Sequence, residues 1–225
     1  MEFKNAPEII EGLKEYVDSA IYGYTEATKK YYDSVCSWME RRHEYKIEPE
    51  WIVEFSGVVP ALHTIVQALT NVNDGVIVMT PVYYPFYKAI KGHERRIIEN
   101  KLIYNEGKYS INFEELEEEA SREDTKLIIL CNPHNPVGRV WTRDELKKVG
   151  EICIRNNVFI VSDEIHFDLI MEGHKHTIFS AISNEFKDNS ILCTAPSKTF
   201  NLAGLQTSNI IIANKKIRDI VKSMV

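Results

Sequence analysis

Lys198 is the residue of this chain best suited to covalent chemistry. It follows an apolar run that predicts a buried strand ending at Ala195. Loops at the carboxyl ends of parallel strands are where open α/β sheets bind ligands. A lysine amine in such a partly enclosed place can lose its proton and attack a carbonyl carbon, forming a Schiff base. A single lysine is more often a solvated surface residue, so this interpretation depends on its neighbours.

Asp163 and Asn135 follow two other predicted strands. A carboxylate at the end of a buried strand, as at Asp163, needs a cation or a strong hydrogen-bond donor beside it. Asn135 lies in residues 132–136, where two Asn-Pro pairs favour extended or turn geometry. A plain turn would show the same pattern, but the loop can also project an amide toward the lysine and the carboxylate.

A phosphate-binding site and an aromatic ring are predicted at two further strand ends. Gly57 precedes a helical pattern over Pro60–Asn71, so the N–H groups of Val58 and Val59 can face an anion. Tyr83 follows the strand expected at Val76–Thr80, where its ring can stack on a flat heterocycle, although core tyrosines are commoner. Together, these strand ends describe a site for a flat, phosphorylated aldehyde.

The elements that would carry these residues alternate between strand and helix. This alternation predicts an α/β fold of three layers, α/β/α, with a mixed, mainly parallel seven-stranded sheet. The strands are expected at Trp51–Phe55, Val76–Thr80, Glu94–Ile98, Lys126–Cys131, Val158–Ser162, Ser190–Ala195 and Ser208–Ala213.

Helices are predicted from apolar residues that recur with helical spacing and from capping signals. They are expected at Pro7–Ile21, Glu26–Glu44, Pro60–Asn71, Asn112–Ser121 and Thr142–Arg155, with a further amphipathic pattern over Ile217–Met224. The pair Thr142 and Glu145 predicts a capping box. We therefore expect residues 1–50 to be an N-terminal helical segment of one large domain, and residues 51–225 to be the part of that domain that holds the sheet.

Composition excludes several classes of protein. The 225 residues include 27 Lys and Arg against 33 Asp and Glu, and the basic residues are scattered, so nucleic acid is not an expected partner. The four cysteines form no C-x-x-C pair, and the acidic run at 114–119 is typical of an exposed helix face, so no metal site is expected. Neither a membrane span nor a secretion signal is visible, which predicts a cytoplasmic protein.

The motifs at 131–138, 162–166 and 194–206 match those of a known family both in their residues and in their order along the chain. They resemble the fold-type I pyridoxal 5′-phosphate enzymes of the class I/II aminotransferase family, and within it the cystathionine β-lyase-like carbon–sulfur lyases. The resemblance implies an enzyme that eliminates pyruvate, ammonia and a thiol from a sulfur-containing amino acid. Amino-group transfer to a 2-oxo acid is the alternative, and an inactive cofactor-binding or regulatory fragment is a further one.

The resemblance also implies roles for residues around the cofactor ring. Lys198 would form the Schiff base with pyridoxal 5′-phosphate and move the substrate α-proton. Asp163 would pair with the ring nitrogen, and Tyr83 would stack on the ring. Asn135 would donate to the ring 3-oxygen, as would His166, which stands where many relatives have tyrosine.

Other implied roles concern the phosphate and the partner subunit. The amides of Val58 and Val59 and the hydroxyl of Ser197 would hold the phosphate. Tyr24 would reach the phosphate of the partner subunit, which implies a homodimer. Gln206 departs from most aminotransferases, which have arginine on the phosphate here, and agrees with the lyase-like branch.

The resemblance implies a longer protein than this chain. Relatives have a segment before Met1 and a small domain after the seventh strand, and that domain carries the arginine that binds the substrate carboxylate. The helical pattern over Ile217–Met224 stops without a capping residue. We therefore expect a truncated large domain that binds cofactor weakly and turns over substrate poorly by itself.

Overall fold

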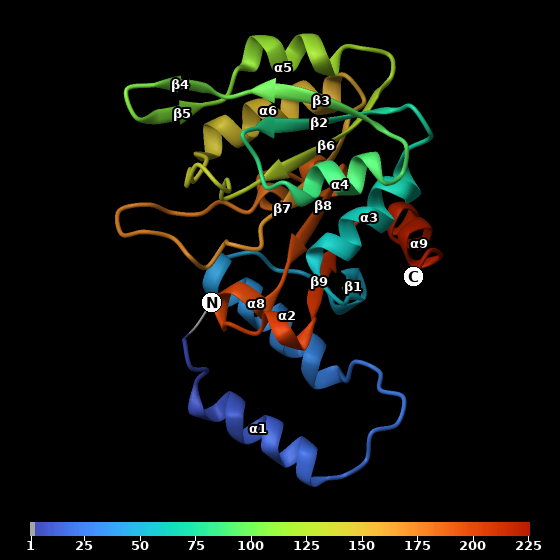
Figure 1. The fold of residues 1–225 in the computed structure, drawn as a ribbon, viewed down its shortest axis with the longest axis vertical. Helices are drawn as coiled ribbons and strands as arrows, with labels where there is room; N and C mark the ends of the chain where they lie inside the picture. Colours follow the sequence, from blue (N-terminus) through green and yellow to red (C-terminus); the bar gives the residue numbers. More distant parts are fainter. Residues whose placement is uncertain (1–2) are drawn as a thin grey trace.

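A seven-stranded sheet forms the centre of the computed structural model, which describes residues 3–225 (Figure 1). Its strands are β1 (Ile52–Phe55), β2 (Gly75–Thr80), β3 (Arg96–Lys101), β6 (Thr125–Cys131), β7 (Phe159–Asp163), β8 (Ser190–Thr194) and β9 (Ser208–Ile211). The strand order is β1-β9-β8-β7-β6-β2-β3, and only the pairings of β9 with β1 and with β8 are antiparallel. The predicted mixed, mainly parallel sheet is confirmed.

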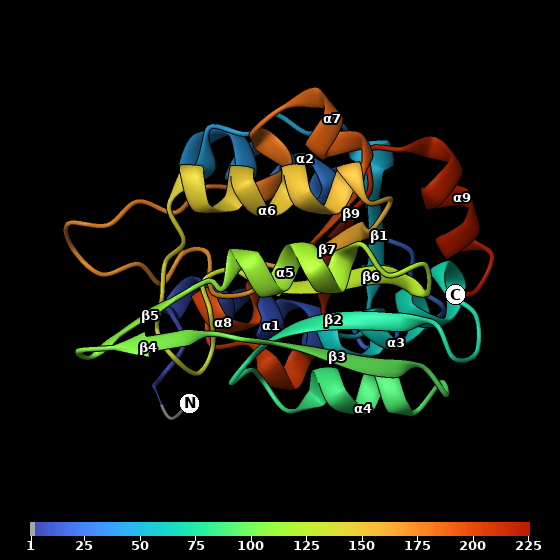
Figure 2. The same cartoon turned by 90° about the horizontal axis from the view of Figure 1, so that it is seen from above.

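Helices cover both faces of this sheet (Figure 2). One layer holds α3 (Val58–Leu69), α4 (Pro85–Lys91) and α9 (Lys215–Lys222); the other holds α2 (Lys29–His43), α5 (Phe113–Ala120), α6 (Arg143–Arg155) and α7 (Asn184–Asp188). Alternate strand residues enter opposite layers, because successive side chains of a strand point to opposite faces. Val76 and Val78 pack in the cluster under α3 and α4, whereas Ile77 and Met79 pack in the cluster under α5 and α6.

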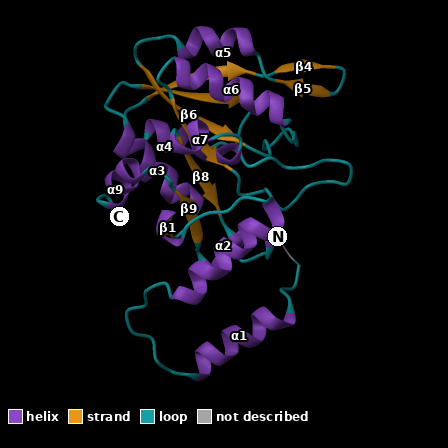
Figure 3. Cartoon of the chain, turned by 180° about the vertical axis from the view of Figure 1, so that it is seen from behind, coloured by secondary structure: helices purple, strands orange, loops and turns teal. Residues whose placement is uncertain are grey.

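The N-terminal segment differs from the rest in its burial. Helix α1 (Pro7–Asp18) lies apart from the sheet layers, and its residues are exposed except for the half-buried Ile9 (Figure 3). Helix α2 begins at Lys29 rather than at the predicted Glu26, because the Thr28 hydroxyl caps it by accepting from the Tyr31 amide at 3.3 Å. Residues 19–28, between the two helices, are exposed throughout.

Some elements differ from the sequence-based expectations. The strand expected at Glu94–Ile98 is shifted toward Lys101, because Glu94 takes a left-handed turn conformation with φ of 62°. Trp51 belongs to the short helix η1 (Pro49–Trp51) rather than to β1. The hairpin of β4 (Ile103–Asn105) and β5 (Lys108–Ser110) was not predicted, since its short, solvated strands lack an apolar face. Helices α4 and α7 were also missed.

The remaining short elements are α8 (Pro196–Thr199), η2 (Phe179–Ala181) and η3 (Ala203–Leu205). Helix α8 starts two residues after the end of β8 and carries Lys198. The end of β8 therefore determines the position of the lysine backbone at the edge of the sheet. Within residues 3–225, no helix combines the length and apolar character needed to cross a bilayer.

Candidate active site

A cavity of about 150 Å³ lies at the carboxyl ends of the parallel strands. Its lining includes Val58, Val59, Tyr83, Asn135, Asp163, His166, Ser197 and Lys198. These are all of the candidate site residues except Tyr24. Because they lie at or just after the carboxyl ends of five different strands, the topology brings them together. Tyr24 lies in the exposed segment between α1 and α2, and its side chain is fully exposed.

The N-terminus of α3 forms one end of this cavity. The first N–H groups of an α-helix have no acceptor within the helix, and the helix dipole favours an anion beside them. In α3 these are the amides of Val58 and Val59, and both residues line the cavity. The side chains of Ser56 and Thr207 line it too, and sequence reasoning did not select them. The arrangement suits a phosphate group.

Asp163 is a buried carboxyl at the end of β7, with 5% of its surface exposed. Burial raises the pKa of Asp163 to about 7, while the Ile165 amide, which donates to Oδ1 at 3.2 Å, and the Lys198 charge oppose that rise. Because burial disfavours the charged form of this carboxyl, a cationic group placed against it would stabilise that form. The protonated nitrogen of a heterocycle is one such group.

His166 and Tyr83 supply rings to the same cavity. Burial, helped by the charge of Lys198, lowers the pKa of His166, so its imidazole is neutral near pH 7 and can donate one hydrogen bond. Burial raises the pKa of Tyr83, whose ring lies edge-on to Phe86 with centroids 6.0 Å apart. Tyr83 is therefore uncharged at neutral pH, and its ring packs against Phe86.

The loop that carries Asn135 is held by residues that sequence reasoning missed. The Cys131 thiol accepts from the backbone N–H of Asn135 at 3.3 Å and donates to the Pro133 carbonyl at 3.4 Å. The buried His134 imidazole donates through Nε2 to the Pro81 carbonyl at 2.9 Å, which ties this loop to the one before Tyr83. The Asn-Pro pairs indicated a turn here, but not these contacts.

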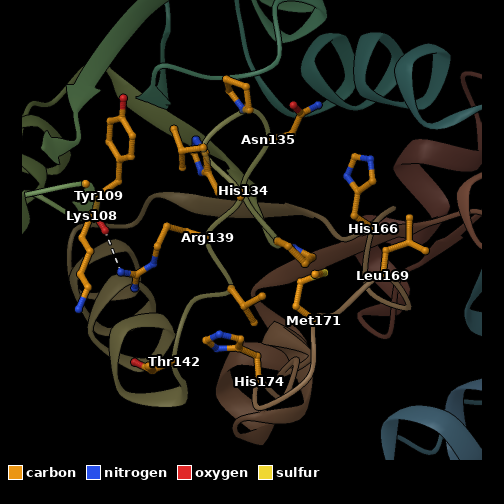
Figure 4. A pocket seen from close by; sticks show the side chains of 16 residues that line it. Lys108, Tyr109, His134, Asn135, Arg139, Thr142, His166, Leu169, Met171 and His174 are labelled. Atoms are coloured by element: carbon orange, nitrogen blue, oxygen red, sulfur yellow. Dashed lines mark hydrogen bonds between the residues drawn. The ribbon is translucent and has the colours of Figure 1, made fainter.

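A second, wider cavity of about 760 Å³ opens beside the first and shares Asn135 and His166 with it (Figure 4). Arg139 lies on its wall and donates to the Tyr109 carbonyl at 2.8 Å, while its guanidinium forms two bonds with Glu145 at 2.7 and 2.9 Å. Arg139 thus connects the β4–β5 hairpin to the start of α6. The two cavities therefore meet at Asn135 and His166.

A fold of this topology, with a lysine, a buried aspartate and a helix N-terminus around one cavity, is that of the fold-type I pyridoxal phosphate enzymes. The chain belongs to the family described as aminotransferase class I and II, which matches residues 4–225. Within that family, it lies in the branch of the cystathionine β-lyases and carbon–sulfur lyases.

Three relatives show how close this similarity is. The chain is 50% identical to cystathionine β-lyase PatB of Bacillus subtilis (strain 168) over 215 residues, which are 96% of this chain and 56% of that protein. Cystalysin from Treponema denticola, whose crystal structure contains pyridoxal 5′-phosphate, superposes with a TM-score of 0.98 at 50% identity, over 100% of this chain and 57% of that one.

The third relative is the pyridoxal phosphate-bound C–S lyase from Staphylococcus hominis. Its TM-score is 0.93 at 33% identity, over 99% of this chain and 56% of that one. The chain therefore spans little more than half the length of the relatives it matches.

Proposed function

We propose that the protein carrying this chain is a pyridoxal phosphate-dependent C–S lyase. It would eliminate a thiol from the β-carbon of a sulfur-containing amino acid and release pyruvate and ammonia. The observation that supports this most is the convergence of Lys198, Asp163 and the N-terminus of α3 on one cavity. Similarity at 50% identity to a cystathionine β-lyase supports the same reaction.

The residues of the cavity fit pyridoxal phosphate. The Val58 and Val59 amides, with the Ser197 hydroxyl, would hold its phosphate, and Asp163 would hold its ring nitrogen. A protonated ring nitrogen would add a cation beside the buried Asp163 carboxyl, whose charged form the Lys198 charge already favours. When bound, this cofactor withdraws electrons from the substrate α-carbon and so acidifies its proton.

The other residues would orient the ring and move the proton. The Lys198 amine would hold the cofactor and then remove the proton from the substrate α-carbon. Tyr83 would lie against the ring, while Asn135 and the neutral His166 would donate to its 3-oxygen. The wider cavity, which shares Asn135 and His166 with the small one, would receive the leaving thiol.

Aminotransfer is the alternative function, because it starts with the same proton loss. Two residues favour the lyase: His166, and Gln206 where most aminotransferases have arginine. Both line the small cavity. An inactive cofactor-binding or regulatory fragment is a further alternative, which would bind the cofactor without releasing pyruvate or exchanging the amino group.

Mixing the 225-residue chain with pyridoxal phosphate tests cofactor binding. We expect a new absorbance band in the wild type that is lost in Lys198→Ala, because the amine that holds the cofactor is gone. Lys147→Ala, on the exposed face of α6, is the control and should keep the band. A band of equal strength in Lys198→Ala would contradict the proposal.

An assay with cystathionine then separates the reactions. Release of pyruvate and ammonia supports the lyase, whereas exchange of the amino group with a 2-oxo acid supports the aminotransferase.

We also propose a homodimer in which Tyr24 of one subunit reaches the phosphate of the other. Residues 19–28 are exposed throughout, and helix α1 presents the exposed apolar side chains of Ile10, Leu13, Tyr16 and Val17. Exposed apolar side chains gathered on one helix are typical of an interaction surface. A second copy of the chain is the partner that would bury them and bring Tyr24 to a cavity.

A further inference from the structure

Asp168 lies outside the cofactor cavity, between α2 and the short helix α8 that carries Lys198. Its side chain is 3% exposed and is surrounded by donors. Oδ2 accepts from Thr199 Oγ1 at 2.6 Å and from Trp38 Nε1 at 3.0 Å. Oδ1 lies 2.8 Å from His43 Nε2, which donates because an ionised carboxylate can only accept. One carboxylate thus joins α8, through Thr199, to α2, through Trp38 and His43.

Helix α8 needs such an attachment because it has little stability of its own. It spans only Pro196–Thr199, and Ala195, which has no polar side chain, stands at its N-cap. A single helical turn is not self-sustaining. Ser197 and Lys198 line the cofactor cavity, while Pro196 and Thr199 line a separate cavity of about 270 Å³ against α2. The Thr199–Asp168 bond therefore holds α8 on a side other than the one that faces the cofactor cavity.

The donors that surround Asp168 are themselves held by packing. The His43 ring stacks on Phe167 with centroids 4.2 Å apart, and the Trp38 ring meets Phe200 edge-on at 5.0 Å. Burial by itself would raise the pKa of Asp168, but the hydrogen bonds from His43 and Thr199 outweigh it and lower that pKa. The carboxylate is therefore charged at neutral pH, and charge-assisted bonds are the stronger kind.

We propose that Asp168 is a positioning residue for Lys198. By accepting from Thr199 it keeps α8 in the orientation that directs the neighbouring lysine into the cofactor cavity, and by accepting from Trp38 and His43 it fixes that orientation to α2. The assignment of the lysine to a cofactor rests on the proposed function, whereas the attachment of α8 does not.

Two substitutions of Thr199 isolate this hydrogen bond. Thr199→Val keeps the shape of the side chain but removes the hydroxyl, and Thr199→Ser keeps the hydroxyl. Thr64→Val makes the same chemical change on α3, where the hydroxyl donates within its own helix, to the Pro60 carbonyl at 3.4 Å. Asp168→Asn is less informative alone, because the loss of a buried charge can unfold the chain.

The first measurement needs no cofactor. The 225-residue chain is treated with an amine-reactive reagent, and mass spectrometry gives the labelling rate of Lys198 relative to the exposed Lys147. We expect Thr199→Val to change this ratio about threefold upward, because an untied α8 opens more often, while Thr199→Ser and Thr64→Val stay near wild type. General unfolding would raise the ratio as well, because Lys147 is already exposed in the folded chain. The urea midpoint of each variant is therefore measured too, and a raised ratio at an unchanged midpoint identifies local opening of α8.

The second measurement is the pyridoxal phosphate concentration that half-saturates the chain. It should rise about tenfold in Thr199→Val and stay near the wild-type value in Thr199→Ser. If Thr199→Val behaves like Thr64→Val in both measurements, or if Thr199→Ser is as impaired as Thr199→Val, the positioning role is wrong. If the wild type binds no cofactor, the proposed function fails, and the labelling ratio still decides whether Asp168 orients Lys198.

Discussion

At the scale of single residues, the site combines groups that are unfavourable for folding. Asp163 is buried in the cavity floor, between the register partners Cys131 on β6 and Cys193 on β8. These neighbours are thiols whose own pKa is raised by burial, so they give the carboxylate little stabilisation as an anion. Sites that bind ligands are commonly less stable than their surroundings for this reason.

We predict that Asp163→Asn stabilises the cofactor-free chain at pH 8 and does so less at pH 5. Burial raises the pKa of Asp163 from 3.8 to about 7, so the folded chain holds a proton that the unfolded chain has lost between these values. Wild-type stability therefore falls as pH rises through this window, by at most about 4 kcal/mol. Urea unfolding of both proteins at the two pH values measures the difference.

Comparing variant with wild type also cancels the effect of Glu119, where burial raises the pKa to about 7 as well. Pyridoxal phosphate should reverse the order, stabilising the wild type more than Asp163→Asn, because only a carboxylate can pair with the ring cation. A pH-independent difference between the two proteins would be evidence against a buried, titrating Asp163.

At the scale of elements, the strands that run in the same direction place the segments after them at one edge of the sheet, and helix starts hold some of these segments. The start of α6 is an example next to the wider cavity. The Thr142 hydroxyl accepts from the Glu145 amide at 3.2 Å, and the Glu145 carboxylate accepts from the Thr142 amide at 2.7 Å, which confirms the predicted capping box. The same carboxylate holds Arg139, and through it the β4–β5 hairpin.

Thr142→Ala should lower the free energy of unfolding by about 1 kcal/mol, since it leaves a helix N–H without its acceptor. Thr142→Ser keeps the acceptor and should stay within a few tenths of a kcal/mol of wild type. Chemical denaturation of the three proteins provides the measurement. Equal stability of the alanine and serine variants would show that the cap contributes nothing measurable.

At the scale of the whole molecule, the sheet and its two helical layers are closely packed, whereas α1 stands outside them (Figure 1). The Asn5 side-chain amide donates to the Phe200 carbonyl at 2.8 Å, so the chain before α1 is attached beside α8. After α1, the exposed residues 19–28 lead to α2. Helix α1 is thus attached just before its first residue, while its side chains, apart from the half-buried Ile9, remain in solvent. This geometry suits a helix that packs against a second copy.

We predict that Leu13→Asp with Val17→Asp weakens self-association at least tenfold, because two charges would enter the apolar contact of the proposed dimer. Sedimentation equilibrium of the 225-residue chain gives the association constant. Glu11→Lys with Glu15→Lys, on the charged side of α1, is the matched control. Should the aspartate pair associate as strongly as wild type, α1 is not the contact surface.

Much of this protein could be read from its sequence because the signals are local. Apolar runs rich in β-branched residues determine strands, and parallel strands end at one edge, so the sequence alone predicts that Lys198, Asp163 and Asn135 converge. Their presence around one cavity agrees with that expectation. The polar hairpin and the shift of β3 could not be read in this way, since neither leaves an apolar period.

Tertiary structure decided the contacts between distant parts of the chain. Asp168 meets His43 across 125 residues, and His134 meets Pro81 across 53. Neither pair has a spacing signal, because the partners are selected by how helices and loops pack on the sheet rather than by the residues beside them. The residues that bear the chemistry were visible in the sequence, while those that hold them in place became visible only when packing brought their hydrogen-bonding atoms together.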